Sequence, residues 1–184
     1  YTEHQDGLSD VYRQTIMRTA EYARLLENLS ARRNALLFGP AGVGKTDLLR
    51  RFIQKRSEIL FAPKTNSLRD ILVTLIAELV RLGDMRKVDT KSTSSRSLKG
   101  LLVRQLERKP YCIVLDSIAE PTTTIVATVK DFYDFGRTPI IIAAQSIVTQ
   151  FMETFQEFPP RQKAANFTIN QILNKITTTI KIKY

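Results

Sequence analysis

The sequence predicts an α/β fold, a parallel sheet covered by helices on both faces, and three observations support this. Short apolar runs recur along the chain, and segments of helical periodicity separate them. One run leads directly into a glycine-rich turn, Gly39-Pro40-Ala41-Gly42-Val43-Gly44-Lys45-Thr46. Another run, 111–115, ends in the acid Asp116. Strands that alternate with helices take right-handed crossovers, which makes the sheet parallel.

The first half of the chain contains five expected elements. They are, in order, a helix over 10–30, a strand over 32–38, a helix over 45–56, a strand over 58–62 and a helix over 67–82. The last helix has the clearest ends. Ser67 and Asp70 have the spacing of a capping box, and Gly83 supplies a C-terminal stop. A polar, basic segment over 84–95 follows and predicts a mobile loop.

The second half continues the alternation. It predicts a helix over 97–109, a strand over 111–116, a helix over 121–135, a strand over 139–144 and a helix over 148–158. Pro110 is expected to stop the first of these helices, and Gly136 the second. The tail is ambiguous, because either 166–169 or 176–182 could form a further strand.

Composition restricts the class of protein. A chain of 184 residues with 43% hydrophobic residues is long enough for one domain with a substantial core. Its apolar runs are too short to span a membrane, and its N-terminus lacks a signal-peptide pattern. The single cysteine, Cys112, lies in an apolar run and is interpreted as a small buried hydrophobe. These features favour a cytoplasmic protein.

The net charge of +10 is unevenly distributed. Residues 81–109 contain nine basic side chains and three acidic ones, and residues 159–184 contain five basic side chains and no acidic one. Such a distribution is typical of proteins that meet nucleic acid or another polyanion. A solvated surface, or a face that meets an acidic partner, is the simpler interpretation, because aromatic residues are not interleaved with the charges.

The glycine-rich turn has the pattern G-x-x-x-x-G-K-T, which cradles phosphates. Glycines allow backbone N–H groups to turn toward an anion, and the following helix N-terminus adds partial positive charge. Lys45 is expected to reach the outer phosphates, and the Thr46 hydroxyl to ligate Mg²⁺. The predicted nucleotide-binding residues are Gly39, Pro40, Ala41, Gly42, Val43, Gly44, Lys45, Thr46 and Asp47.

Asp116 is the second predicted metal residue. An acid at the end of a buried strand can hold Mg²⁺ together with Thr46, and a strand-terminal aspartate that caps a turn is the alternative. Hydrolysis also needs a group that orients the attacking water. Ser117 cannot act as a general base, so Glu120 is the candidate, although its charge could simply favour a helix start.

Further polar residues follow the strand over 139–144, at the edge of the sheet where ligands bind. Gln145, or Ser146 in its place, could hydrogen-bond the γ-phosphate or the water. Arg161 and Lys163 could reach a neighbouring subunit's nucleotide, but a surface role is the simpler interpretation.

With these residues placed, the chain resembles the AAA+/STAND group of P-loop ATPases, in the branch of origin-recognition and transposition-helper ATPases. The resemblance covers roughly residues 10–170 and rests on GPAGVGKT (39–46), YCIVLD (111–116), PIIIAAQS (139–146) and VTQFMETFQEF (148–158). It implies a three-layer fold with a five-stranded parallel sheet of order 5-1-4-3-2. An N-terminal helical segment, 1–30, would pack on a core formed by 31–184.

The resemblance also assigns roles to particular residues. Lys45 and Thr46 would be the Walker A pair, Asp116 the Walker B acid, and Gln145 or Ser146 the sensor-1 residue. Active members usually carry glutamate after the Walker B acid, whereas this chain carries Ser117. The helical lid of the family is not recognisable in the tail.

Three functional hypotheses follow. The first is an ATP-binding, Mg²⁺-dependent ATPase core that is slow at hydrolysis and whose ATP/ADP state controls shape or self-association. The second is an ATP-dependent DNA-binding helper, and the third a module that binds nucleotide without hydrolysing it.

Overall fold

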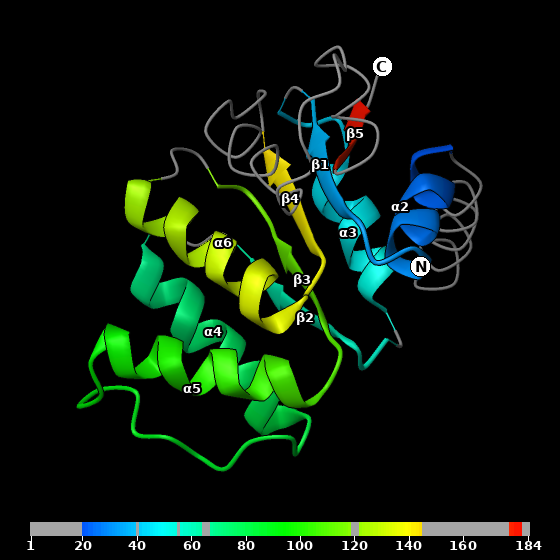
Figure 1. The fold of residues 1–184 in the computed structure, drawn as a ribbon. Helices are drawn as coiled ribbons and strands as arrows, with labels where there is room; N and C mark the ends of the chain where they lie inside the picture. The colour runs from blue at the N-terminus through cyan, green and yellow to red at the C-terminus, as the bar shows by residue number, and fades with distance from the viewer. Residues whose placement is uncertain are drawn as a thin grey trace, which may run out of the picture.

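A computed structural model describes residues 20–39, 41–54, 56–63, 67–118, 122–144 and 177–181 of the chain. Its centre is a five-stranded sheet in the order β2-β3-β4-β1-β5 (Figure 1). The strands are β1 (Asn34–Phe38), β2 (Ile59–Ala62), β3 (Cys112–Leu115), β4 (Ile140–Ala144) and β5 (Thr177–Lys181).

All four pairings in the sheet are parallel. The order of β1, β4, β3 and β2 matches the prediction, and β5 pairs with the remaining edge of β1. Of the two candidate segments in the tail, 176–182 contains β5, and 166–169 lies outside the described residues. Because the strands are parallel, their carboxyl ends meet at one edge of the sheet, and this edge carries the candidate site.

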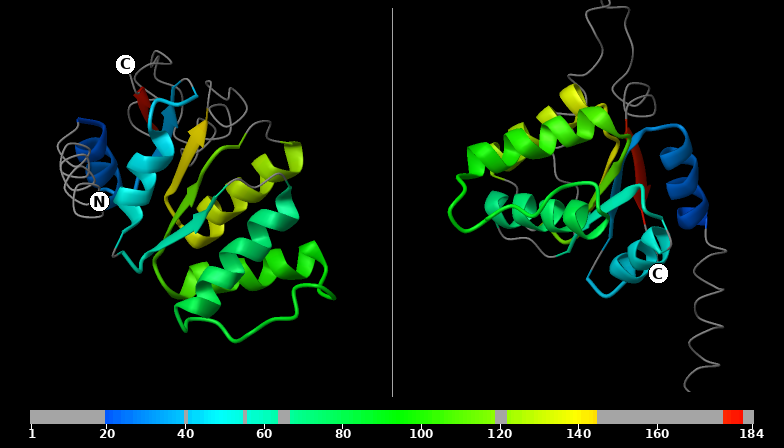
Figure 2. Two further views of the ribbon diagram at one scale, coloured as in Figure 1. Left: turned by 180° about the vertical axis from the view of Figure 1, so that it is seen from behind. Right: turned by 90° about the horizontal axis from the view of Figure 1, so that it is seen from below.

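Helices cover both faces of the sheet (Figure 2). The helices are α2 (Ala20–Ser30), α3 (Lys45–Ile53), α4 (Leu68–Arg81), α5 (Ser95–Arg108) and α6 (Thr123–Gly136). On one side α4, α5 and α6 pack with the sheet around the buried residues Leu75, Leu102 and Phe132. On the other side α2 and α3 pack around Leu25 and Phe52. The predicted α/β architecture is therefore present in the described residues.

The helix α2 is held against α3 by an aromatic and cationic contact. The rings of Tyr22 and Phe52 meet edge to face, with centroids 6.3 Å apart. The guanidinium of Arg56, which follows α3, lies 5.3 Å from the centroid of the Phe52 ring and donates to the Tyr22 hydroxyl of α2 at 3.4 Å. The first part of the predicted helix over 10–30 lies outside the described residues, so the description begins at Ala20.

The ends of α4 follow the predicted chemistry. Ser67 Oγ accepts a hydrogen bond from the Asp70 N–H at 3.1 Å, and Gly83 takes the left-handed conformation with φ 77°. The Ser67 hydroxyl also donates to the Asp70 carboxylate at 2.7 Å.

The helix α6 ends at Gly136, as predicted. Gly136 is the last residue of the helix, and Arg137, with φ 46°, is the left-handed residue that follows it. A Cβ on Gly136 would lie 2.8 Å from Leu106 Cβ and 2.8 Å from Thr138 Oγ1. The glycine is therefore required by the close approach of α6 to α5, and not by the turn.

The connecting loop, residues 82–94, is joined to α4 by hydrogen bonds that its polar composition did not predict. Arg69 of α4 donates hydrogen bonds to the carbonyls of Thr90 at 2.6 Å, Thr93 at 3.1 Å and Lys91 at 3.3 Å. Asp89 forms a turn inside the loop, where it accepts from the Lys91 N–H at 3.0 Å. A polar composition predicts a loop but does not reveal an arginine on a neighbouring helix that holds it.

Cys112 lies in β3 and is buried, as its apolar surroundings in the sequence predicted. Burial raises the pKa of its thiol to about 12, so the thiolate that reacts with oxidants and metals is disfavoured. Among the described residues, no helix is both long and apolar enough to cross a membrane.

Candidate phosphate and metal site

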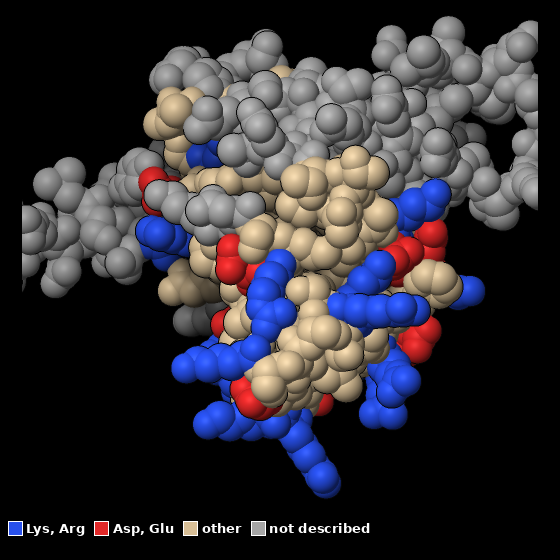
Figure 3. Space-filling model, turned by 90° about the vertical axis from the view of Figure 1, so that its left-hand side faces the viewer, with Lys and Arg blue, Asp and Glu red and all other residues tan. Residues whose placement is uncertain are grey.

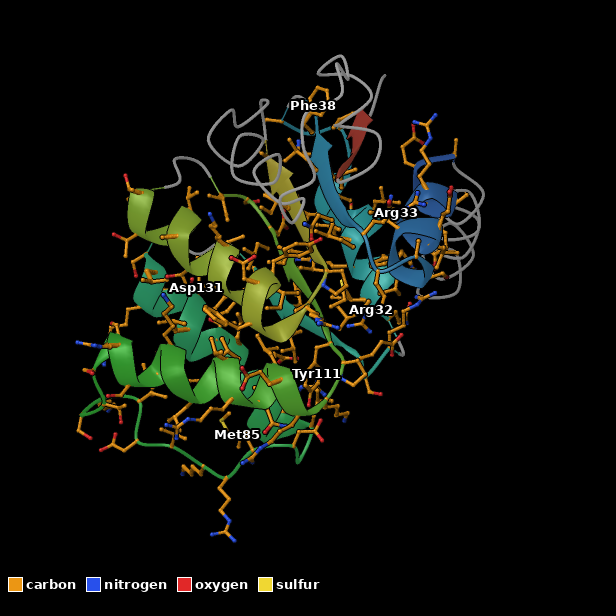
Figure 4. The ribbon with its side chains drawn as sticks, viewed as in Figure 1. Arg32, Arg33, Phe38, Met85, Tyr111 and Asp131 are labelled. Carbon is orange, nitrogen blue, oxygen red and sulfur yellow. The ribbon has the colours of Figure 1, made fainter. Side chains whose placement is uncertain are left out.

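The glycine-rich turn leaves β1 at Phe38, which Figure 4 labels at the carboxyl end of that strand. Gly42 and Gly44 both adopt left-handed conformations, with φ 79° and 88°, which other residues rarely take. Gly44 is the N-cap of α3, and its carbonyl accepts the first helical hydrogen bond, from the Leu48 N–H at 2.9 Å. The two glycines therefore turn the chain sharply into the N-terminus of a helix, the arrangement that binds phosphate.

Lys45 is the first residue of α3, and its ammonium group reaches back across the turn. Lys45 Nζ donates to the carbonyl oxygen of Gly39 at 2.6 Å. Burial lowers the pKa of Lys45 below its usual value of 10.5, and the negative charge of Asp116 opposes this shift. A partly desolvated ammonium group is a strong ligand for phosphate oxygens because water competes with them less.

Thr46 and Asp116 are 70 residues apart in sequence and meet in the structure. Thr46 Oγ1 donates to Asp116 Oδ2 at 2.8 Å. Asp116 follows β3, its side chain is buried with 2% of its surface exposed, and its N–H donates to the Ala62 carbonyl of the neighbouring strand at 3.0 Å. The pairing of β3 with β2 thus fixes the backbone that carries the carboxylate.

Ser117 forms a hydrogen bond to the second carboxylate oxygen of Asp116. Its hydroxyl donates to Asp116 Oδ1 at 3.0 Å, and its backbone takes the left-handed conformation with φ 57°. This conformation is unfavourable for residues other than glycine. The side chain after the acid is therefore turned back onto Asp116.

The donor set fits Mg²⁺ bound with a nucleotide. Mg²⁺ prefers oxygen ligands and is usually held by one or two protein groups together with phosphates and water. The Thr46 hydroxyl and the Asp116 carboxylate supply two such oxygens 2.8 Å apart, next to the phosphate-binding turn. Lys45 adds the positive charge that a triphosphate requires.

Several predicted site residues lie outside the described part of the chain. These are Pro40, Glu120, Gln145, Ser146, Arg161 and Lys163. Gly39, Ala41, Val43 and Asp47 are described, and Asp47 belongs to the first turn of α3. The structure thus brings together Lys45, Thr46 and Asp116, and their assigned roles remain predictions.

Sequence reasoning did not identify two features of the site. It did not predict the hydrogen bond from the Ser117 hydroxyl to Asp116, and it did not predict that Lys45 donates to the Gly39 carbonyl. Neither feature has a sequence signal. The left-handed conformation of Ser117, for example, is set by the surrounding chain and is not a preference of serine.

The lowered pKa of Lys45 predicts how nucleotide binding depends on pH. The ammonium form binds phosphate, so affinity for ATP is expected to be constant near neutral pH and to fall as the pH rises through this pKa, below 10.5. Fluorescence titration with a labelled ATP between neutral pH and the alkaline limit of folding measures this. A Lys45→Arg variant keeps its charge throughout and should lack the alkaline decline. An equal decline in both proteins would assign the effect to another group.

Comparisons with known proteins identify the family and the fold of the chain. A family model described as an AAA domain matches residues 27–152. No curated protein matches the chain. Among solved structures, Drosophila ORC bound to DNA superposes with a TM-score of 0.54 at 10% identity, over 94% of this chain and 92% of that one.

Two archaeal structures are also similar. A Walker-type ATPase of Pyrococcus abyssi has a TM-score of 0.54 at 16% identity, over 89% of this chain and 53% of that one. A Signal Transduction ATPase with Numerous Domains (STAND) from Pyrococcus horikoshii, which carries a tetratricopeptide repeat sensor, has a TM-score of 0.52 at 13% identity. That match covers 88% of this chain and 22% of the STAND protein, so this chain spans about half and about a fifth of the two archaeal proteins. At these identities the likeness shows the fold alone.

The family match starts within α2 and runs through the phosphate-binding turn and Asp116 to beyond β4. Because it covers more than half of the sequence, the chain belongs to the AAA domain family of nucleotide-binding P-loop ATPases.

Proposed function

We propose that this chain is the core of a switch: an ATPase that binds ATP with Mg²⁺ and hydrolyses it slowly. The observation that carries the proposal is the contact of Thr46 with Asp116 beside the phosphate-binding turn, combined with a serine after the acid. The groups proposed to bind Mg²⁺ and phosphate therefore lie together, whereas the residue directly after Asp116 is not a carboxylate that could orient water.

We assign the following roles to the residues of the site. The turn over 39–46 and Lys45 hold the phosphates, and Thr46 and Asp116 hold the metal. Bound Mg²⁺ would neutralise charge on the β- and γ-phosphates. We assign Glu120 to orient the water, and Gln145, the next residue in sequence after β4, to contact the γ-phosphate. Loss of that contact after hydrolysis would change the loops at this edge of the sheet.

The test measures ATP binding and phosphate release separately. We expect the wild-type chain to bind ATP in Mg²⁺ and to release phosphate below about 0.1 per second, against about 10 per second for a typical enzyme. Glu120→Gln should leave binding unchanged and reduce release at least about 100-fold, the lower end of a general base's contribution. Release at typical enzyme rates would contradict a switch, and no release at all would favour a module that only binds nucleotide.

A second candidate function is an ATP-dependent DNA-binding helper. Two observations favour it: the basic surface of residues 81–109 and the similarity of fold to Drosophila ORC, which was solved bound to DNA. We propose that the nucleotide state of this chain controls its association with DNA. Duplex binding measured with ATP, with ADP and without nucleotide tests this, and binding that is equal in all three states would exclude such control.

A further inference from the structure

Three arginines lie in a row on the exposed side of α5, with a glycine between the first two. Arg96, Gly100, Arg104 and Arg108 form this basic stripe, and all four residues are exposed. We propose that the basic stripe binds the phosphate backbone of duplex DNA without reading its sequence. The inference rests on the second candidate function and names the surface that would carry it.

The spacing of the stripe places its charges on one side of the helix. Residues four apart lie on the same face of a helix and rise about 6 Å along its axis. Gly100 stands in the middle of the line, and a Cβ placed there would have no atom within 4 Å. A phosphate backbone can therefore approach the helix closely at Gly100, with arginines on both sides.

Two acidic side chains nearby, Asp84 and Asp131, are paired with lysines and not with the stripe. Asp84 pairs with Lys109 at 2.6 Å, and Asp131 of α6, which Figure 4 labels, pairs with Lys99 of α5. Within the described residues, no ion pair includes an arginine of the stripe. Glu107 is the acid on the exposed side of α5 and reduces the net charge by one.

The connecting loop adds three exposed cations to the same part of the molecule: Arg86, Lys87 and Lys91. The Arg69 hydrogen bonds to Thr90, Lys91 and Thr93 fix this loop, and Arg69 Nη1 also donates to Ser95 Oγ at the start of α5 at 3.3 Å. Figure 3 shows lysine and arginine side chains around the lower half of the molecule, where α4, α5 and this loop lie. The backbone that carries Lys91 is therefore held next to the start of α5 before any partner binds.

The chemistry of the surface favours a duplex over other polyanions. Single strands are usually bound on aromatic side chains, and membranes by inserted apolar ones. Among the described residues, the one large hydrophobic side chain that is exposed is Phe135, on α6. Arginines without aromatic neighbours provide contacts to phosphates, and such contacts are independent of sequence.

The experiment compares two triple variants that lose the same charge. The stripe variant replaces three arginines by alanine: Arg96, Arg104 and Arg108. The control variant replaces three exposed arginines on the opposite side of the sheet by alanine: Arg24, Arg33 and Arg50. Binding to a duplex of mixed sequence is measured against salt, with ATP and Mg²⁺ present. The stripe variant should lower the slope of log affinity against log salt by about 3, since each phosphate contact contributes about 0.9. The control should change it by less than about 1.

Labelled-ATP binding and a thermal melt, measured on every variant, separate this inference from the proposed function. If the wild type binds duplex and both triple variants weaken it equally, net charge and not the stripe carries binding. If the wild type binds ATP but no duplex, the inference and the DNA-binding candidate both fail while the ATPase proposal stands. A stripe variant that loses binding to polyglutamate or anionic vesicles, but not to duplex, would assign the surface to another partner.

Discussion

The variant Lys45→Ala is expected to lose ATP binding almost completely. Lys45 carries a partly desolvated ammonium group on the first residue of α3, 2.6 Å from the Gly39 carbonyl, and alanine removes both the charge and its reach. Charge-assisted hydrogen bonds to phosphate are about twice as strong as neutral ones, so affinity should fall at least about 100-fold. Equilibrium titration with a fluorescent ATP measures this loss.

A suitable control is Arg50→Ala, which removes one positive charge from the exposed side of the same helix. Its ATP affinity should remain within about threefold of the wild type, because an exposed charge away from the phosphates is screened by salt. A Lys45→Ala protein that is folded and binds ATP normally would show that the turn does not hold phosphate, and the proposed function would fail with it.

The variant Gly136→Val is expected to destabilise the fold by about 3 kcal/mol, the upper range for added bulk in a packed interface. Its Cβ would meet Leu106 Cβ at 2.8 Å, and an atom bonded directly to the backbone of α5 cannot rotate away. The helices α5 and α6 must therefore separate. Urea unfolding followed by circular dichroism measures the loss, which corresponds to about 6–12 °C in melting temperature for a chain of this size.

A substitution at the next residue, Arg137, serves as a control and is expected to raise the stability of the protein. Arg137 is left-handed with φ 46°, and glycine adopts this conformation without the steric cost, so Arg137→Gly should stabilise the protein by about 0.5–1 kcal/mol. The hydrogen bond from Arg32 to the Arg137 carbonyl survives this change because it uses the backbone. A neutral Gly136→Val would show that α6 does not approach α5 closely at this position.

The candidate site was predictable where each residue's chemistry is local. The pattern of glycines before Lys45 and Thr46 requires a sharp turn into a helix, and both Gly42 and Gly44 take the left-handed conformations that the pattern implies. Asp116 was predictable because an acid at the end of an apolar run lies at the edge of a parallel sheet. The contact of Thr46 with Asp116 follows from these two facts and from the right-handed crossover.

Other features depended on partners that are distant in sequence. Periodicity gave α4 and α5 their apolar faces, but it could not show that Arg69 reaches the carbonyls of residues 90–93. The polar composition of residues 84–95 predicted a mobile loop. Composition alone does not reveal that side chains elsewhere donate hydrogen bonds to the carbonyls of this loop. The predicted end of α6 at Gly136 is confirmed, but the contact of this glycine with Leu106 could not be predicted, because it exists only once α5 and α6 pack.

The sequence by itself therefore determined the α/β class, the phosphate-binding turn and the acid that faces it, because each depends on local backbone preference and on alternating elements. Only the tertiary structure decided how the side chain after Asp116 is oriented and which surface the cations of α5 share. Ser117 lies back on Asp116, and the arginines of the stripe form no ion pair among the described residues, since packing of the surrounding chain sets both arrangements. These two arrangements underlie the proposals of slow hydrolysis and of duplex binding.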